Sequence, residues 1–157
     1  MKAMLIIVTT IILAGVILFF VLAYKSKSGS APGLVNGSLT KCPAKPLCVC
    51  SEHSDDVSHY IDPIPLPTKT TFDALTLVKV ILVDMGGTLQ SESENYLAFS
   101  FSSRIFGFVD DIEIRLDPTQ RLIHLRSASR IGRSDLGVNR SRIELFKQKW
   151  QLNIPQH

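Results

Sequence analysis

The sequence has few of the residues that usually form a metal site or a nucleic-acid surface. It holds three cysteines and four histidines in 157 residues, and its net charge is only +3. Cys42, Cys48 and Cys50 lie close together, and with the nearby His53 and His59 they match no standard zinc spacing. The positive charge is too weak to indicate nucleic-acid binding, and no alternation of aromatic and basic residues supports it. We therefore expect no metal, no other cofactor and no nucleic acid.

Charge is absent from residues 3–24, which are almost wholly apolar. At about 1.5 Å per residue this run reaches roughly 33 Å as a helix, enough to cross a hydrocarbon core of about 30 Å. The run is longer than the core of a usual signal peptide, and Leu22-Ala23-Tyr24 lacks a small-x-small cleavage site. We predict that residues 1–24 are an uncleaved anchor, so that the chain is a single-pass membrane protein.

The lysines around this run do not decide which side of the membrane the rest of the chain occupies. Lys2 precedes the run and Lys25 and Lys27 follow it, so the positive-inside comparison is nearly balanced. Lys41 and Lys45 favour a cytoplasmic domain, whereas the very short tail before the apolar run favours export. The side stays open, with a slight preference for the extracytoplasmic one.

The remaining chain divides into a linker and one small domain. Residues 25–40 are small and polar, which is typical of a flexible linker. Residues 41–157 are enough for one modest core. Their patterns predict an α+β domain in which two helices cover one face of an antiparallel sheet. The predicted strands are 88–91, 96–103, 109–116 and 122–127, and the predicted helices run from a cap at Thr70 or Thr71 to Asp84 and from Val138 to Gln151.

Two segments of this domain allow more than one interpretation. Residues 78–83 are rich in β-branched side chains, so a buried strand competes with the first helix there. The cysteines form a disulfide between Cys42 and Cys48, if the domain is exported, or are simply small buried residues. In the first case Cys50 is left as the odd thiol.

The densest polar feature begins with Phe-Gly-Phe-Val-Asp-Asp at 106–111 and ends at Arg142. Six of the eight arginines fall between Arg121 and Arg142, with one acid, Asp135, among them. Such a cluster either holds a buried polar network together or faces an anionic partner. The candidate network is Asp110, Asp111, Asp135, Asn139, Ser127 and Ser129, and the candidate anion site is Arg126, Arg130, Arg133 and Arg140.

Enzymatic patterns are incomplete. Residues 80–89 look like the first motif of haloacid dehalogenase-like phosphatases, with Asp84 in the place of the nucleophile. However, Gly86 stands where the second acid belongs, so the leaving group has no proton donor. A hydrolytic set of Ser127 or Ser129 with His124 and an aspartate lacks the glycines of a nucleophile elbow. We assign no catalytic residue.

Three motifs together resemble the domain of unknown function 1499 family. They are a Cys-Pro-x-x-Pro-x-Cys-Val-x-Ser start at 42–51, the Phe-Gly-Phe-Val-Asp-Asp element at 106–111 and a long Arg/Ser/Gly signature at 126–142. The sequence departs from the family pattern at Leu47 and Cys50, where asparagine and serine are usual. The resemblance implies a membrane-associated, often bacterial protein, and brings no established activity. We predict a protein of the bacterial inner membrane whose domain binds or scaffolds another membrane or envelope protein, with an arginine-lined anion site; the alternative is a membrane-anchored, hydrolase-like enzyme acting on an anionic substrate.

Overall fold

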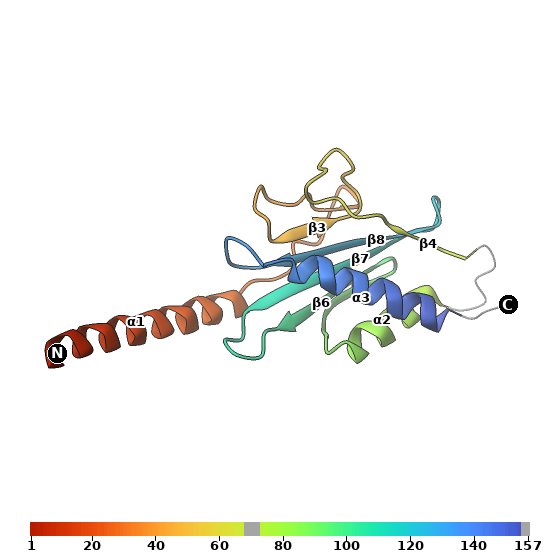
Figure 1. The fold of residues 1–157 in the computed structure, drawn as a ribbon. Helices are drawn as coiled ribbons and strands as arrows, with labels where there is room; N and C mark the ends of the chain where they lie inside the picture. Colours follow the sequence, from red (N-terminus) through yellow and green to blue (C-terminus); the bar gives the residue numbers. More distant parts are fainter. Residues whose placement is uncertain (68–72, 155–157) are drawn as a thin grey trace.

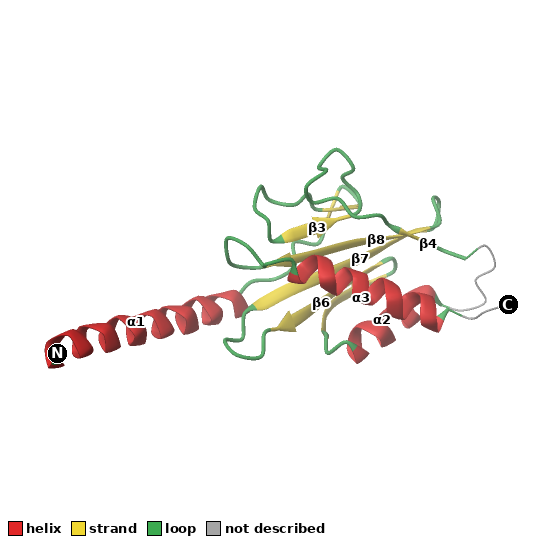
Figure 2. Cartoon of the chain, in the orientation of Figure 1, coloured by secondary structure: helices red, strands yellow, loops and turns green. Residues whose placement is uncertain are grey.

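The computed structural model of the chain describes residues 1–67 and 73–154, and its centre is a six-stranded antiparallel sheet (Figures 1 and 2). The strand order is β3-β8-β7-β6-β5, and β4 also pairs with β8. The strands are β3 (Cys48–Cys50), β4 (Ile64–Pro65), β5 (Thr88–Ser93), β6 (Tyr96–Ser102), β7 (Val109–Asp117) and β8 (Leu122–Ser129). A separate hairpin joins β1 (Leu34–Val35) and β2 (Ser38–Leu39), and the helices are α1 (Lys2–Lys27), α2 (Ala74–Asp84) and α3 (Val138–Asn153).

Helices α2 and α3 lie together on one face of the sheet, as Figure 2 shows. The alternation of β6 points Leu97, Phe99 and Phe101 into the core beneath these helices. From α3, Phe146 and Trp150 are almost completely buried in the same core. The predicted α+β class, with an antiparallel sheet covered by two helices, is confirmed.

Helix α2 begins later than predicted, because its first turn is capped by Asp73. The Asp73 carboxylate accepts hydrogen bonds from the Leu75 amide at 3.0 Å and from the Thr76 hydroxyl at 2.6 Å. These bonds satisfy donors that have no partner inside the first turn of a helix. The predicted caps, Thr70 and Thr71, lie outside the described residues. The competing strand at 78–83 is wrong, since these residues are helical.

The opposite face of the sheet is covered by the chain that follows α1. We predicted a linker at 25–40, but residues 25–27 continue α1, and the rest contains the β1–β2 hairpin. Leu39 is 1% exposed and packs with the cysteines of β3. The Asn36-Gly37 turn of this hairpin has both residues at positive φ, 52° and 79°. An Asn-Gly pair is a strong hairpin signal, which a prediction from composition alone does not take into account.

Residues 51–67, for which we predicted neither a helix nor a strand, contain one short strand. Strand β4 pairs with β8 through Ile64 and Pro65. Proline lacks the amide hydrogen that a central strand needs, so a two-residue strand at the sheet edge suits it. Strand β3 was missed because three residues are too few to show an alternation.

Helix α1 leaves the domain at one end of the sheet (Figure 1). It is one helix that is long and apolar enough to cross a membrane, among the residues that the structure describes. Its apolar side chains are largely exposed up to Val21, whereas Ala23 and Ser26 are 1% exposed because they pack on the domain. The end of α1 is therefore part of the folded domain.

Candidate functional site

The arginine-rich block occupies β8, the loop after it and the start of α3. Strand β8 pairs with β7 along its length, and residues 110 and 111 lie opposite 129 and 128. Because side chains alternate across a sheet, the block is divided between the two faces. One set of polar side chains meets the chain that follows α1, and the other meets α3.

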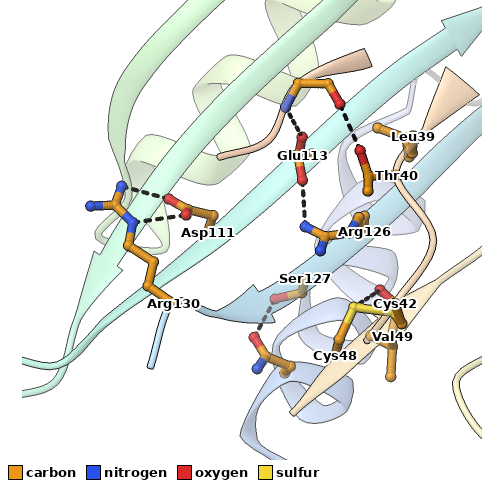
Figure 3. Close-up of polar contacts among 12 residues, drawn as sticks. Leu39, Thr40, Cys42, Cys48, Val49, Asp111, Glu113, Arg126, Ser127 and Arg130 are labelled. Carbon is orange, nitrogen blue, oxygen red and sulfur yellow. Dashed lines mark hydrogen bonds and ion pairs between the residues drawn. A yellow bond between two sulfur atoms is a disulfide. The ribbon is translucent and has the colours of Figure 1, made fainter. Parts of the chain in front are cut away.

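On the face away from α2 and α3, Arg126 and Glu113 form a buried ion pair (Figure 3). The Arg126 Nη1 atom donates to Glu113 at 2.6 Å, and Glu113 is 0% exposed. The other carboxylate oxygen accepts from the Tyr96 hydroxyl at 2.8 Å and from the Gly33 amide at 3.0 Å. Burial, followed by the Glu113 charge, raises the pKa of Tyr96, so this hydroxyl remains a donor. Glu113, on β7, thus bonds to the neighbouring strands β6 and β8 and to the segment that we predicted as a linker.

Arg130 joins the sheet to α1. Its guanidinium makes two parallel hydrogen bonds to Asp111, at 2.8 and 2.7 Å (Figure 3). Its Nη1 atom also donates to the carbonyls of Ser26 and Lys27, both at 3.3 Å. These carbonyls end α1, where the helix leaves acceptors unpaired and favours a cation. Arg130 therefore holds the end of α1 on β7.

Further contacts hold the same end of α1. The Ser26 hydroxyl accepts from the Val109 amide at 3.0 Å while donating to the Ala23 carbonyl. Phe19 stacks on Phe106, with ring centroids 5.2 Å apart. We call the contacts of α1 with Phe106, Val109 and Arg130 the anchor junction. The Phe-Gly-Phe-Val-Asp-Asp element thus meets α1 with its aromatic part and Arg130 with an aspartate.

On the helix-covered face, a second network centres on Asn139, which is 0% exposed. The Asn139 side-chain oxygen accepts from the Ser127 hydroxyl at 2.6 Å and from Arg142 at 2.8 Å. Its amide group donates to the Leu47 carbonyl at 2.9 Å and to Ser129 at 3.1 Å. Asn139 thereby joins β8, α3 and the cysteine loop.

Arg142 closes this network against β7. It donates to Asp110 at 2.7 Å, and its guanidinium lies 4.9 Å from the centre of the Phe101 ring. Asp135, a member of the predicted polar network, pairs with backbone amides rather than with an arginine. Its carboxylate accepts from the amides of Gly137 and Asn139 at 3.0 and 2.8 Å, and so caps α3.

The four arginines of the candidate anion site do not converge on one surface. Arg126 and Arg130 are buried against carboxylates, as described above. Arg133 is exposed in the loop before α3, and within the described residues no carboxylate pairs with it. Arg140 is exposed on α3 and donates to the carbonyls of Tyr60 at 3.3 Å and Ser58 at 3.5 Å. The prediction treated them as one set, but Arg126 and Arg130 face the carboxylates of β7, whereas Arg133 and Arg140 come after the chain has left the sheet.

Arg140 lines a small cleft of about 200 Å³, which we call the Arg140 cleft. The cleft lies between the cysteine loop, the loop around His59 and the start of α3, and it continues into a shallower hollow beside Lys41 and Lys45. The acids here are already engaged: Asp56 holds His59 at 2.8 Å, Lys41 holds Asp55, and Asp135, which also lines the cleft, accepts from two backbone amides at the start of α3. The hydrogen bond from His59 lowers the pKa of Asp56. Arg140 is left with neutral carbonyl partners.

The serines and the histidine of the possible hydrolytic set are apart. Ser127 faces α3, whereas His124 lies on the opposite face and contacts Ser51 at 3.2 Å. Burial lowers the pKa of His124. Asp84 ends a helix rather than a strand, and it pairs with Lys149 at 2.7 Å.

Of the two alternatives left open for the cysteines, the structure has the disulfide. Cys42 and Cys48 form a disulfide with Cα atoms 5.7 Å apart. Cys50 is a buried free thiol, and burial raises its pKa, which disfavours the reactive thiolate. Among the described residues no group of three or more His, Cys, Asp or Glu side chains is placed to hold a metal ion.

Sequence reasoning missed two acids of the site. Glu113 lies within the predicted strand 109–116, but we did not include it in the predicted polar network. Glu52 pairs with Arg115 and accepts from the Leu39 amide at 2.5 Å. The sequence does contain a signal for Glu113. It shares one face of β7 with Asp111 and Arg115, and three charges on one strand face require partners or solvent.

The fold and these contacts define an α+β domain that is folded onto the end of a long apolar N-terminal helix. The chain belongs to the family described as "Protein of unknown function (DUF1499)", whose model matches residues 38–149. Comparison with curated proteins and with solved structures found no match. The matched region starts after α1, so the junction residue Ser26 lies outside it.

Proposed function

We propose that this protein is a single-pass membrane protein whose domain is a binding or scaffolding module for an anionic group of another membrane or envelope protein. The observation that carries the proposal is the state of Arg140. Its guanidinium lines an open cleft and, among the residues that the structure describes, is bonded to carbonyl oxygens alone. An exposed arginine held in place but not neutralised suits a carboxylate or phosphate, because its planar fork matches both.

Retention of α1 as an anchor is supported by the anchor junction. Cleavage directly after the apolar run, at Tyr24, would remove Ala23 and expose the surface that it covers. Cleavage beyond Ser26 would also leave the Val109 amide without its Ser26 partner. A cleaved signal peptide has no reason to complete the packing of the mature domain.

An extracytoplasmic location of the domain is supported by the Cys42–Cys48 disulfide. Disulfides persist in oxidising compartments and are rare in the cytosol. The inner membrane of a bacterium, with the domain on the periplasmic side, is the location that we propose.

The Arg140 cleft can be tested in the full-length protein reconstituted in nanodiscs. We expect inorganic phosphate and acetate to shift the imidazole signals of His59, and Arg140→Gln to abolish the shift. Arg121→Gln is the matched control, since Arg121 is another exposed arginine bonded to a carbonyl, that of Pro67, at the far end of β8. Equal shifts in Arg140→Gln and wild type would remove the proposed site.

The partner can be sought with a photoreactive residue at Ala44, which lines the same hollow. We expect one discrete crosslinked species in native membranes, and its loss in Arg140→Gln but not in Arg121→Gln. Crosslinks that are identical in all three proteins would contradict recognition through Arg140. The serine considered for the enzyme alternative on β8, Ser127, bonds to Asn139, whereas His124 on the opposite face contacts Ser51 instead, so the hydrolytic set drawn from the sequence is not assembled among the described residues.

A further inference from the structure

The β6–β7 loop, residues 103–108, touches α1 inside its apolar run. Phe106 packs against Phe19 and Phe20 at centroid distances of 5.2 and 5.7 Å, and Phe108 meets Phe19 at 6.3 Å. In Figure 1 this loop lies at the end of the domain from which α1 leaves. Contacts with residues this far from the end of α1 require the loop to reach back along the helix.

The position of these contacts sets a depth. Phe19 lies five residues before Tyr24, where the apolar run ends. At about 1.5 Å per residue, Phe19 lies roughly 7 Å inside the run. Because the run is about as long as the hydrocarbon core is thick, the Phe106 ring lies below the headgroups when α1 spans the bilayer. Side chains of interfacial segments reach a similar depth, about 5–10 Å.

The tip of the loop has the side chains that such a position requires. Ile105 is 79% exposed on the domain, although it is a large apolar residue. The turn that presents it is fixed, since the Ser103 hydroxyl accepts from the Phe108 amide at 3.0 Å and Gly107 has φ of 74°. A rigid apolar tip in water is unfavourable, and the same tip in a bilayer is not.

Basic residues lie at the same end of the domain as this apolar tip, and two are next to the loop: Arg104 precedes Ile105, and the Lys27 side chain approaches Gly107. Lys25, Lys27, Arg104 and Arg133 are all exposed, and within the described residues no carboxylate pairs with any of them. Arg133 belongs to the β8–α3 loop, which Arg130 fastens to the end of α1 and which lies at the same end of the domain in Figure 1. Cations beside an apolar insertion suit lipid phosphates, because their stems lie along apolar surface while their charges reach the headgroups.

We propose that the β6–β7 loop inserts Ile105 and Phe106 into the leaflet that α1 leaves, with the four basic residues at the level of the phosphates. The proposal rests on the proposed function in one respect, namely that α1 crosses the bilayer. The domain then touches the membrane at two points, α1 and the loop. Two points of contact fix its tilt, and so fix the height and direction of the Arg140 cleft.

The test uses tryptophan fluorescence of the full-length protein in phospholipid vesicles. Trp150 is the single tryptophan and is 1% exposed in the core, so wild type gives the baseline. Ile105→Trp places a probe at the loop tip. Val57→Trp is the matched control, because Val57 is 84% exposed but belongs to the loop around His59, away from α1. The vesicles contain lipids brominated at a shallow or a deep position of the acyl chain.

We expect shallow-brominated lipids to quench the added fluorescence of Ile105→Trp at least twofold, more than deep-brominated lipids do, and to leave Val57→Trp unchanged. Equal and weak quenching of the two variants, in protein that floats with the vesicles after alkaline extraction, overturns loop insertion but leaves the anchor intact. Protein that fails to float overturns the anchor and, with it, this proposal.

Discussion

Two pairs of arginines from the same sequence block have opposite surroundings. Arg126 and Arg130 are buried and each meets a carboxylate, whereas Arg133 and Arg140 are exposed without one among the described residues. The first pair is aligned on one face of β8, beside the carboxylates of β7. The second pair follows the point at which the chain leaves the sheet. Since an unpaired buried charge is very unfavourable, the first pair serves the fold, and the second is available to a ligand or a surface.

The strongest test of this difference between the two pairs of arginines is Glu113→Gln, which keeps the shape of the side chain and removes its charge. Arg126 would then be a buried cation without a counter-ion. We expect the free energy of unfolding to fall by about 3–5 kcal/mol, as for other buried pairs that lose one partner. Chemical denaturation of the full-length protein in detergent micelles measures it.

The same experiment has a rescue. Combining Glu113→Gln with Arg126→Met removes both charges, while the glutamine oxygen can still accept from Tyr96 and Gly33, so most of the lost stability should return. A Glu113→Gln protein that unfolds at the wild-type denaturant concentration would show that Arg126 is not committed to the fold.

Arg130→Ala should have the next largest effect, because it breaks a nearly buried ion pair and releases the end of α1 at the same time. We expect a loss of about 2–3 kcal/mol, less than for Glu113 because Lys27 and its surroundings are open to water. Proteolysis of residues 28–31 should become faster. Arg130→Lys is the control, because it keeps the charge and loses the bidentate contact with Asp111. Its free energy of unfolding should lie between those of wild type and Arg130→Ala. An unchanged melting temperature would argue against the anchor junction.

Most of the sheet and both domain helices followed from the sequence, because β6, β7 and β8 alternate in their side chains and α3 repeats buried residues every three or four positions. Strands of two or three residues, such as β1 and β4, are too short to show a period. Their positions depend on contacts far away in the chain. For example, Gly33 meets Glu113 eighty residues later.

The candidate site was harder to predict for the same reason. The sequence shows that Asp110, Asp111 and six arginines are present, and local alternation shows which strand face each residue takes. It does not show that the end of α1 lies beside Arg130. The contacts are made by the backbone carbonyls of Ser26 and Lys27, which every residue type has. Pairing between an arginine and a particular aspartate is a property of strand register, which only the assembled sheet defines.

The pH dependence of stability offers a smaller effect on the same polar face. Burial lowers the pKa of His124 in the folded protein, so this imidazole stays neutral there. As the pH falls below about 6.5, the unfolded chain binds a proton at this position that the folded chain rejects. Stability should therefore be highest above this pH and should decrease as the pH falls. His124→Gln should flatten that part of the curve in urea melts recorded between about pH 5 and 8. A mutant curve parallel to wild type would mean that other groups cause the decrease.

Arg133→Ala should change the free energy of unfolding least, because an arginine that does not serve the fold can be removed without destabilising it. Arg133 is exposed and has no carboxylate partner among the described residues, so its removal should change the free energy of unfolding by no more than about 0.5 kcal/mol. The measurement is the same denaturant melt that is used for Glu113→Gln. A loss above about 1 kcal/mol would place Arg133 in an internal network, because surface substitutions away from such networks do not reach that size. It would also remove Arg133 from the four cations that we assign to the lipid phosphates. A silent Arg133→Ala beside a damaging Glu113→Gln would show that one sequence signature contains two kinds of arginine, one required to fold the domain and one free to meet what lies outside it.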